Sequence, residues 1–292
     1  MTTQQFTDSR SEFISINGLR YHIRRWGSPD APLLLLLHGW MDMSATFQFT
    51  INHFAHTWNI VAPDWRGFGL SEHVPGGYYA PDYLADLDAL LTHYSPHAPA
   101  RIVGHSMGGM IACLYAGIRT DRVARLTSIE GFGLSATSPD EAPHRYARWL
   151  SQRRASVHFS PLGGLDDIAQ RLMKRNPHLP TERAYFLAEA LSERDADGTL
   201  RYRADPVHKQ VNPVLYHLEE AKACWRHIHC PIQWIRGEES DGTQFAQGVF
   251  ATLDKRRSCF AHLQETVIKQ AGHMVQWDQP EALAQAIEGF MW

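Results

Sequence analysis

A run of five leucines, Leu33–Leu37, is the feature that most constrains the fold of this chain. His38 and Gly39 close the run, and an uninterrupted apolar stretch of this length, bounded by turn residues, is typical of a strand buried on both faces. Strands of this kind occur in parallel sheets that carry helices on both sides. The run is far shorter than the roughly 20 apolar residues that a membrane-spanning helix needs.

The same pattern recurs along the chain and alternates with helical patterns. Further strand-like runs lie at 58–62, 101–103, 126–129, 232–235 and 266–268, and Asn17-Gly18 joins two more runs in a predicted hairpin. Apolar residues at helical spacing predict helices over 84–94 and 283–291. This alternation predicts an α/β fold with a mostly parallel eight-stranded sheet, flanked by helices and opened by an antiparallel edge.

The alternation stops between residues 134 and 228. This stretch is rich in arginine and proline, has helical patterns over 166–174 and 181–191, and shows no clear buried strand. We therefore predict that 134–228 is a mostly helical cap inserted after the sixth strand. Residues 1–133 and 229–292 would together form the core domain.

Composition and charge limit the partners of the protein. The 292 residues are 44% hydrophobic, enough to form a core without disulfides, and the net charge of −3 gives no electrostatic case for nucleic acid or an anionic membrane. The opening residues are polar, without the apolar stretch of a signal peptide, and the four cysteines form no C-x-x-C pair. We expect a cytoplasmic monomer or homodimer that acts on a small molecule, with no nucleic-acid or membrane partner.

Ser106 is the residue for which the sequence predicts a nucleophilic role. It lies in the segment Gly-His-Ser-Met-Gly-Gly (104–109), after a predicted strand and before a helix rich in small residues. A serine on a sharp strand-to-helix turn needs small neighbours two residues away on either side, and Gly104 and Gly108 provide them. The start of the helix would present free N–H groups where negative charge develops on a substrate oxygen.

A serine nucleophile needs a base and an oxyanion hole. His273 follows the last predicted strand and precedes the final helix, which makes it the predicted base. The oxyanion hole is predicted from the backbone N–H groups of Trp40, just after the five-leucine strand, and Met107, just after the nucleophile.

Two positions compete for the acid that would orient His273. The usual position, three residues past the glycine that ends the 232–235 strand, holds Ser240, and Asp241 lies one residue later. Glu130 follows the 126–129 strand, where a buried carboxylate is costly unless it is paired. Pairing with a histidinium would stabilise it, so we favour Glu130 and keep Asp241 as the alternative.

The order of these motifs resembles that of the α/β-hydrolase superfamily. The motifs are His38-Gly39, Asp64-x-Arg-Gly-x-Gly-x-Ser71, Ser106 and Gly272-His273. The segments His-Gly-Trp-Met-Asp (38–42) and Leu-Met-Lys-Arg-Asn-Pro-His-Leu (172–179) look like the HGWLDN-type and N-x-H-L elements of its serine-hydrolase-like branch. The resemblance implies an acid after the sixth strand, where Glu130 lies. Ser106 also sets the chain apart from the haloalkane dehalogenases and epoxide hydrolases of this fold, which carry Asp there.

The motifs and the resemblance together predict a carboxylesterase-like serine hydrolase. It would cleave a small-to-medium, apolar carboxylic ester or related acyl compound through a Ser-His-acid triad and an acyl-enzyme. This chemistry needs no metal and no cofactor. The alternatives are a C–C bond hydrolase of a diketone-type substrate, which uses the same triad, and a non-catalytic ligand receptor on the same fold.

Overall fold

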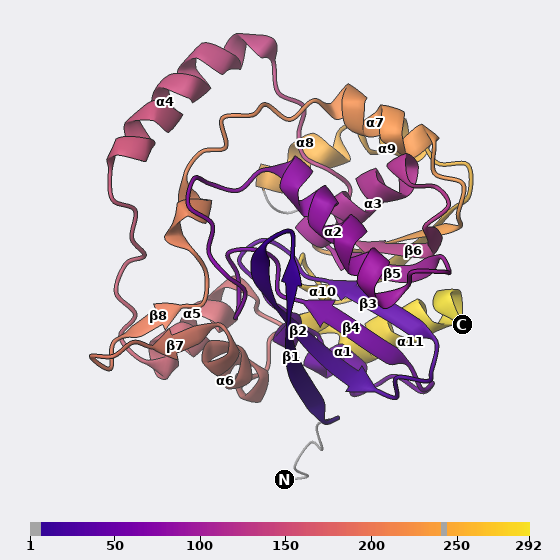
Figure 1. Ribbon diagram of the computed structural model, residues 1–292, viewed down its shortest axis with the longest axis horizontal. Coiled ribbons are helices and arrows are strands. Elements are labelled where there is room, and N and C mark those ends of the chain that lie inside the picture. The colour runs from indigo at the N-terminus through magenta and orange to yellow at the C-terminus, as the bar shows by residue number, and fades with distance from the viewer. Residues whose placement is uncertain (1–6, 241–243) are drawn as a thin grey trace.

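The structure, a computed structural model, describes residues 7–240 and 244–292 and is built around an eight-stranded sheet (Figure 1). The strand order is β1-β2-β4-β3-β5-β6-β9-β10. The strands are β1 (Ser9–Ile16), β2 (Leu19–Gly27), β3 (Leu33–Leu37), β4 (Asn59–Pro63), β5 (Ala100–His105), β6 (Val123–Ile129), β9 (Ile232–Gly237) and β10 (Leu263–Ile268). β1 and β2 pair antiparallel at one edge, and the strands from β4 to β10 are parallel. The predicted α/β fold with its antiparallel edge is confirmed.

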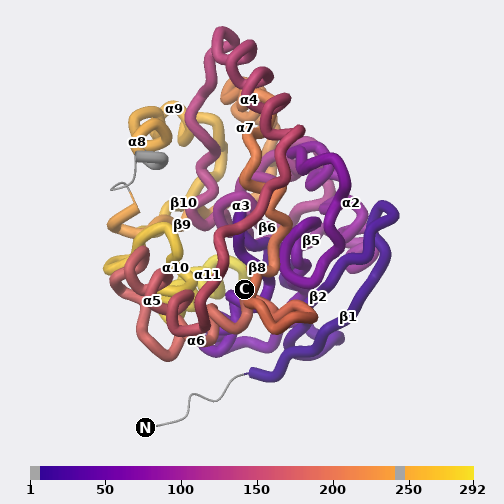
Figure 2. Tube along the Cα trace, turned by 90° about the vertical axis from the view of Figure 1, so that its left-hand side faces the viewer, coloured from indigo at the N-terminus to yellow at the C-terminus, as the bar shows by residue number. Residues whose placement is uncertain are grey.

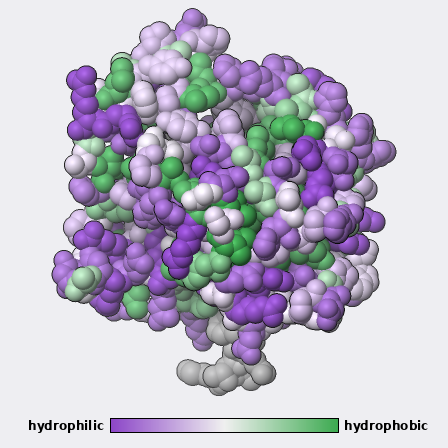
Figure 3. Space-filling model, viewed as in Figure 1, coloured by the Kyte–Doolittle hydropathy of each residue, from purple (hydrophilic) through white to green (hydrophobic). Residues whose placement is uncertain are grey.

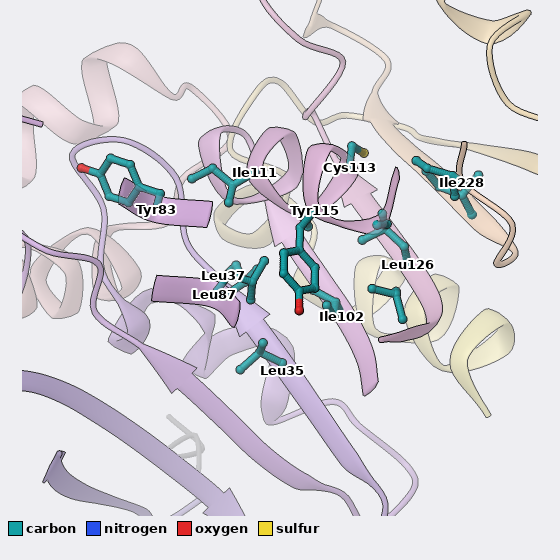
Figure 4. Packing of buried hydrophobic residues seen from close by; sticks show 14 of the residues in the cluster. Leu35, Leu37, Tyr83, Leu87, Ile102, Ile111, Cys113, Tyr115, Leu126 and Ile228 are labelled. Carbon is teal, nitrogen blue, oxygen red and sulfur yellow. The ribbon is translucent and has the colours of Figure 1, made fainter. Parts of the chain in front are cut away.

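The leucines of β3 point alternately to the two faces of the sheet, and both faces are covered by helices. Leu35 and Leu37 belong to a core cluster with side chains of the helices on one face (Figure 4). Leu34 and Leu36 belong to a second cluster with side chains of the helices on the other face. The first face carries α2 (Ala80–Tyr94), α3 (Met107–Ile118), α7 (Leu218–Arg226), α8 (Gln244–Phe250) and α9 (Leu253–Arg257). The second carries α1 (Gln48–Ile51), α10 (Val275–Asp278) and α11 (Pro280–Met291).

The register of the parallel strands brings their carboxyl ends to one edge of the sheet. Leu37 is paired with Gly104, and His105 with Ile129. The loops that follow β3, β5, β6 and β9 therefore begin side by side. In open α/β sheets, ligands bind at this edge.

The chain between β6 and β9 is mostly helical. It contains α4 (Ala142–Arg154), α5 (Leu165–Arg175), α6 (Thr181–Ala190), the short hairpin of β7 (Ser192–Arg194) and β8 (Leu200–Tyr202), α7, and 3-10 turns at Pro139–Glu141 and Pro206–Lys209; a further 3-10 turn, Ser44–Phe47, follows β3 and leads into α1. α5 and α6 pack together, while α4 has no buried residue and stands away from the sheet in both views (Figures 1 and 2). α7 packs against α3. The division into core and cap at 134–228 stays a prediction.

Within residues 7–240 and 244–292, the helices are too short or too polar to cross a membrane.

Candidate active site

Ser106 lies on a sharp turn between β5 and α3. Its backbone has φ 49° and ψ −115°, an unfavourable conformation for a residue with a side chain. A Cβ atom on Gly104 would lie 2.5 Å from the backbone of Gly108, and one on Gly108 would lie 2.3 Å from the carbonyl oxygen of Leu37. The crowding predicted around this serine is therefore present, and it leaves room only for glycine at both positions.

Two side chains from distant parts of the sequence meet Ser106. The Oγ of Ser106 lies 3.0 Å from Nε2 of His273, and Nδ1 of His273 lies 3.4 Å from Oε2 of Glu130. His273 follows β10 and keeps 38% of its side chain exposed, whereas Glu130 follows β6 and keeps only 4% exposed. The structure thus brings together the serine, the histidine and the favoured acid in one hydrogen-bonding series.

The carboxylate of Glu130 is held by two hydrogen bonds to the oxygen that does not contact His273. Its Oε1 accepts hydrogen bonds from the backbone N–H of Gly237, at 2.7 Å, and from the hydroxyl of Ser240, at 2.6 Å. The serine that occupies the usual acid position is therefore used to hold Glu130 in place. The alternative acid, Asp241, lies outside the described residues.

The loop after β3 lies directly against the nucleophile. A Cβ atom on Gly39 would be 3.2 Å from Cβ of Ser106. His38 fixes this loop, because its Nε2 accepts from the backbone N–H of Trp65 and its Nδ1 donates to the carbonyl oxygen of Gly39. Burial lowers the pKa of His38 to about 4, which keeps the ring neutral in this arrangement.

Trp40 and Met107, the residues predicted to form the oxyanion hole, border the same cavity as Ser106 and His273. Met107 is the first residue of α3, and the first N–H groups of a helix have no acceptor within the helix. The assignment of their N–H groups to an oxyanion stays a prediction.

The cavity beside Ser106 measures about 620 Å³ and is largely apolar. Its wall combines residues of the sheet domain with residues of the segment between β6 and β9, and aromatic side chains are prominent: Trp40, Tyr78, Tyr79, Tyr83, Trp149 and Tyr216. Among the described residues that line it, none is Asp, Glu, Lys or Arg. On the face seen in Figure 3, hydrophobic side chains gather near the middle and are surrounded by hydrophilic ones.

Sequence reasoning missed most of this wall. Tyr78 and Tyr79 lie just before α2 and Tyr83 lies in its first turn, while Val207, His208 and residues 210–213 come from the segment before α7. These three tyrosines are close together in the sequence, which hints at an aromatic surface. No local pattern shows, however, that this surface faces Ser106. In the part of the chain that the structure describes, no three His, Cys, Asp or Glu side chains are arranged to hold a metal ion.

Comparisons with known proteins match this architecture. The family model described as alpha/beta hydrolase fold matches residues 32–280. A serine hydrolase-like protein of Danio rerio is 24% identical over 91% of this chain and 83% of its own length. A 2-(acetamidomethylene)succinate hydrolase of Mesorhizobium japonicum is 25% identical over 96% of this chain and 95% of its own. A solved thioesterase domain from the curacin biosynthetic pathway has a TM-score of 0.85 at 23% identity, covering 96% of this chain and 99% of that domain.

Proposed function

The chain belongs to the alpha/beta hydrolase fold family, in its serine-hydrolase-like branch, and from this premise we propose that it hydrolyses carboxylic esters or related acyl compounds through a serine nucleophile. The observation that carries the proposal is the 3.0 Å contact between Ser106 Oγ and His273 Nε2 in the wall of an apolar cavity. Nucleophile and base within hydrogen-bond reach, with the base oriented by a third group, are the signature of this chemistry.

In the proposed mechanism, Ser106 attacks the acyl carbonyl carbon while His273 takes the hydroxyl proton at Nε2. The carboxylate of Glu130 accepts a hydrogen bond from Nδ1–H of His273 and stabilises the histidinium that forms. The N–H groups of Trp40 and Met107 donate to the developing oxyanion. His273 then gives its proton to the leaving group. Water, activated by the same histidine, attacks the acyl-enzyme carbonyl and releases the acid.

The lining of the cavity supports an uncharged substrate of moderate size. A volume of about 620 Å³ lies within the range of small-molecule sites, and aromatic walls favour apolar groups. The Mesorhizobium japonicum relative is named for a succinate, which carries carboxylates. The described lining offers no lysine or arginine to pair with a carboxylate, so we propose an uncharged acyl group for this chain.

The proposal is tested with p-nitrophenyl esters from acetate to long-chain acyl groups, with the Ser106→Ala variant beside the wild type. We expect turnover that is lost in the variant, with an optimum acyl length set by the cavity. A fluorophosphonate probe should label the wild type and leave the variant unlabelled. Equal ester hydrolysis by both proteins, without labelling of the wild type, would refute the proposal and favour a ligand receptor.

A further inference from the structure

The residue before the nucleophile has contacts that the proposed mechanism does not use. We propose that His105 is a positioning residue, which fixes the backbone of His273 to the strand that carries Ser106. This inference rests on the proposed function, because it takes His273 as the base. It adds that the backbone of His273 must be held in place by His105 for the triad to work at its full rate.

The hydrogen bonds of His105 define its tautomer. Its ring is almost fully buried at the end of β5, and Nε2 lies 2.9 Å from the backbone oxygen of His273. A carbonyl oxygen only accepts, so Nε2 must carry the hydrogen and Nδ1 must present a lone pair. The side-chain amide of Gln276 lies 3.2 Å from Nδ1 and donates to it. Burial lowers the pKa of His105 to about 3, so the ring stays neutral at ordinary pH.

The series continues to the loop after β3. The same amide nitrogen of Gln276 lies 3.4 Å from Oδ2 of Asp42, whose Oδ1 accepts from the backbone N–H of Met43. Gln276 is fully buried, and its amide oxygen has no hydrogen-bond partner among the described residues. An unpaired buried oxygen is costly. The cost of this orientation is offset by the contacts of the amide nitrogen, which donates to the lone pair on Nδ1 of His105 and lies against Oδ2 of Asp42.

His273 needs such a connection because its own side chain is weakly held. The ring is partly exposed, and its 3.4 Å contact with Glu130 is longer than an ordinary hydrogen bond. The neighbouring N–H of Gly272 donates to Asp278, at 3.0 Å, which holds the loop from the side of α10. The bond from His105 holds it from the side of the nucleophile. A displacement of about 1 Å in a reacting group can lower the rate by about 10²-fold.

The ring of His105 also contacts the loop that carries Trp40. A Cβ atom on Gly39 would lie 2.9 Å from Nδ1 of His105, so this loop packs directly on the imidazole. One buried ring thus lies against the loop of the proposed oxyanion hole and donates to the loop of the proposed base.

Two amide variants separate positioning from general support of the fold. In His105→Gln, the amide nitrogen reaches the position of Nε2 and can still donate to the carbonyl oxygen of His273. In His105→Asn, the amide is one methylene shorter and reaches only the position of Nδ1. We expect kcat for ester hydrolysis to fall by about 10²-fold in the Asn variant, with KM little changed, and to be largely retained in the Gln variant.

The rates are expressed per active site, counted by fluorophosphonate labelling, so that unfolded protein does not contribute. Equal kcat per labelled site in the two variants would overturn the proposal. If Ser106→Ala hydrolyses esters as fast as the wild type, the proposed function fails instead.

The tautomer supplies a test that needs neither substrate nor variant. In ¹⁵N-histidine-labelled wild type, assigned through the backbone resonances, His105 should show a protonated Nε2 and an unprotonated Nδ1 at neutral pH. The opposite tautomer would overturn the proposal even if the variants do not fold.

Discussion

At the residue scale, the role of Glu130 as the acid of the proposed triad can be tested by a single substitution. In Glu130→Gln, the donors from Gly237 and Ser240 would keep the amide oxygen on their side, so the amide nitrogen would face Nδ1 of His273. Two donors would then oppose each other and favour the wrong histidine tautomer. We expect kcat to fall by about 10⁴-fold, as in triads whose acid is replaced by its amide, measured with a p-nitrophenyl ester.

Two control variants accompany this prediction. Ser240→Ala removes one hydrogen bond to the carboxylate and leaves its charge, so the loss should be about tenfold. Asp241→Asn should stay near the wild-type rate. A large loss in Asp241→Asn, with Glu130→Gln near wild type, would assign the acid to Asp241.

The residues of the candidate site differ in how far they could be predicted from sequence. Ser106 and His273 follow strands and lie within two residues of a glycine, so local sequence marks both. Glu130 required an argument about the cost of a buried carboxylate. His105 and Gln276 have no such signal, because their contact spans 171 positions and depends on side-chain hydrogen bonding alone.

At the scale of helices and strands, two glycines make a matched test of packing. A Cβ atom on Gly117 of α3 would lie 1.9 Å from the carbonyl oxygen of Cys224 in α7, whereas one on Gly289 of α11 would meet nothing within 4 Å. Gly117→Ala should therefore destabilise the protein by about 1–3 kcal/mol. Gly289→Ala should stabilise it by about 0.5–1 kcal/mol, because alanine favours a helix. Urea unfolding measures both, and changes of the same sign would contradict the packing of α3 on α7.

The same packing explains which elements the sequence could reveal. Leu33–Leu37 is buried on both faces, so its apolar run predicts the strand directly. α4 has only a short apolar stripe, Tyr146, Trp149 and Leu150, among polar and charged residues, and none of its residues is buried, so its pattern does not mark a helix clearly. β7 and β8 are three residues each, too short for an alternating pattern to stand out.

At the scale of the whole molecule, the cavity lined by the sheet's loops and by the segment between β6 and β9 predicts that the enzyme selects its substrates by charge. We compare p-nitrophenyl butyrate with the p-nitrophenyl monoester of succinic acid, which has the same chain length and a terminal carboxylate. The charged ester should have kcat/KM lower by about 10²-fold or more, because the described lining offers no cation to compensate for lost hydration. Equal values would show that the carboxylate stays in water or meets a cation.

Stability should fall in mild acid because His38 and His105 are buried as neutral rings. Burial lowers their pKa values from 6.5 to about 4 and about 3, so below pH 6.5 the unfolded chain binds protons that the native state does not. Each histidine should therefore cost about 2 kcal/mol of unfolding free energy at pH 5. Burial raises the pKa of Asp42 to about 7, so the native state holds a proton there and the effect is opposite.

Two variants separate these opposing contributions in urea unfolding at pH 7 and pH 5. In His38→Gln, the amide oxygen can still accept from Trp65 but does not titrate, so the loss of stability between the two pH values should be about 2 kcal/mol smaller than in the wild type. In Asp42→Asn, the opposing proton is removed, and the loss should be about 2 kcal/mol larger. An unchanged pH dependence in His38→Gln would mean that the native protein protonates this histidine as readily as the unfolded chain does. That result would contradict the burial and the hydrogen bonds that hold the loop after β3 against Ser106.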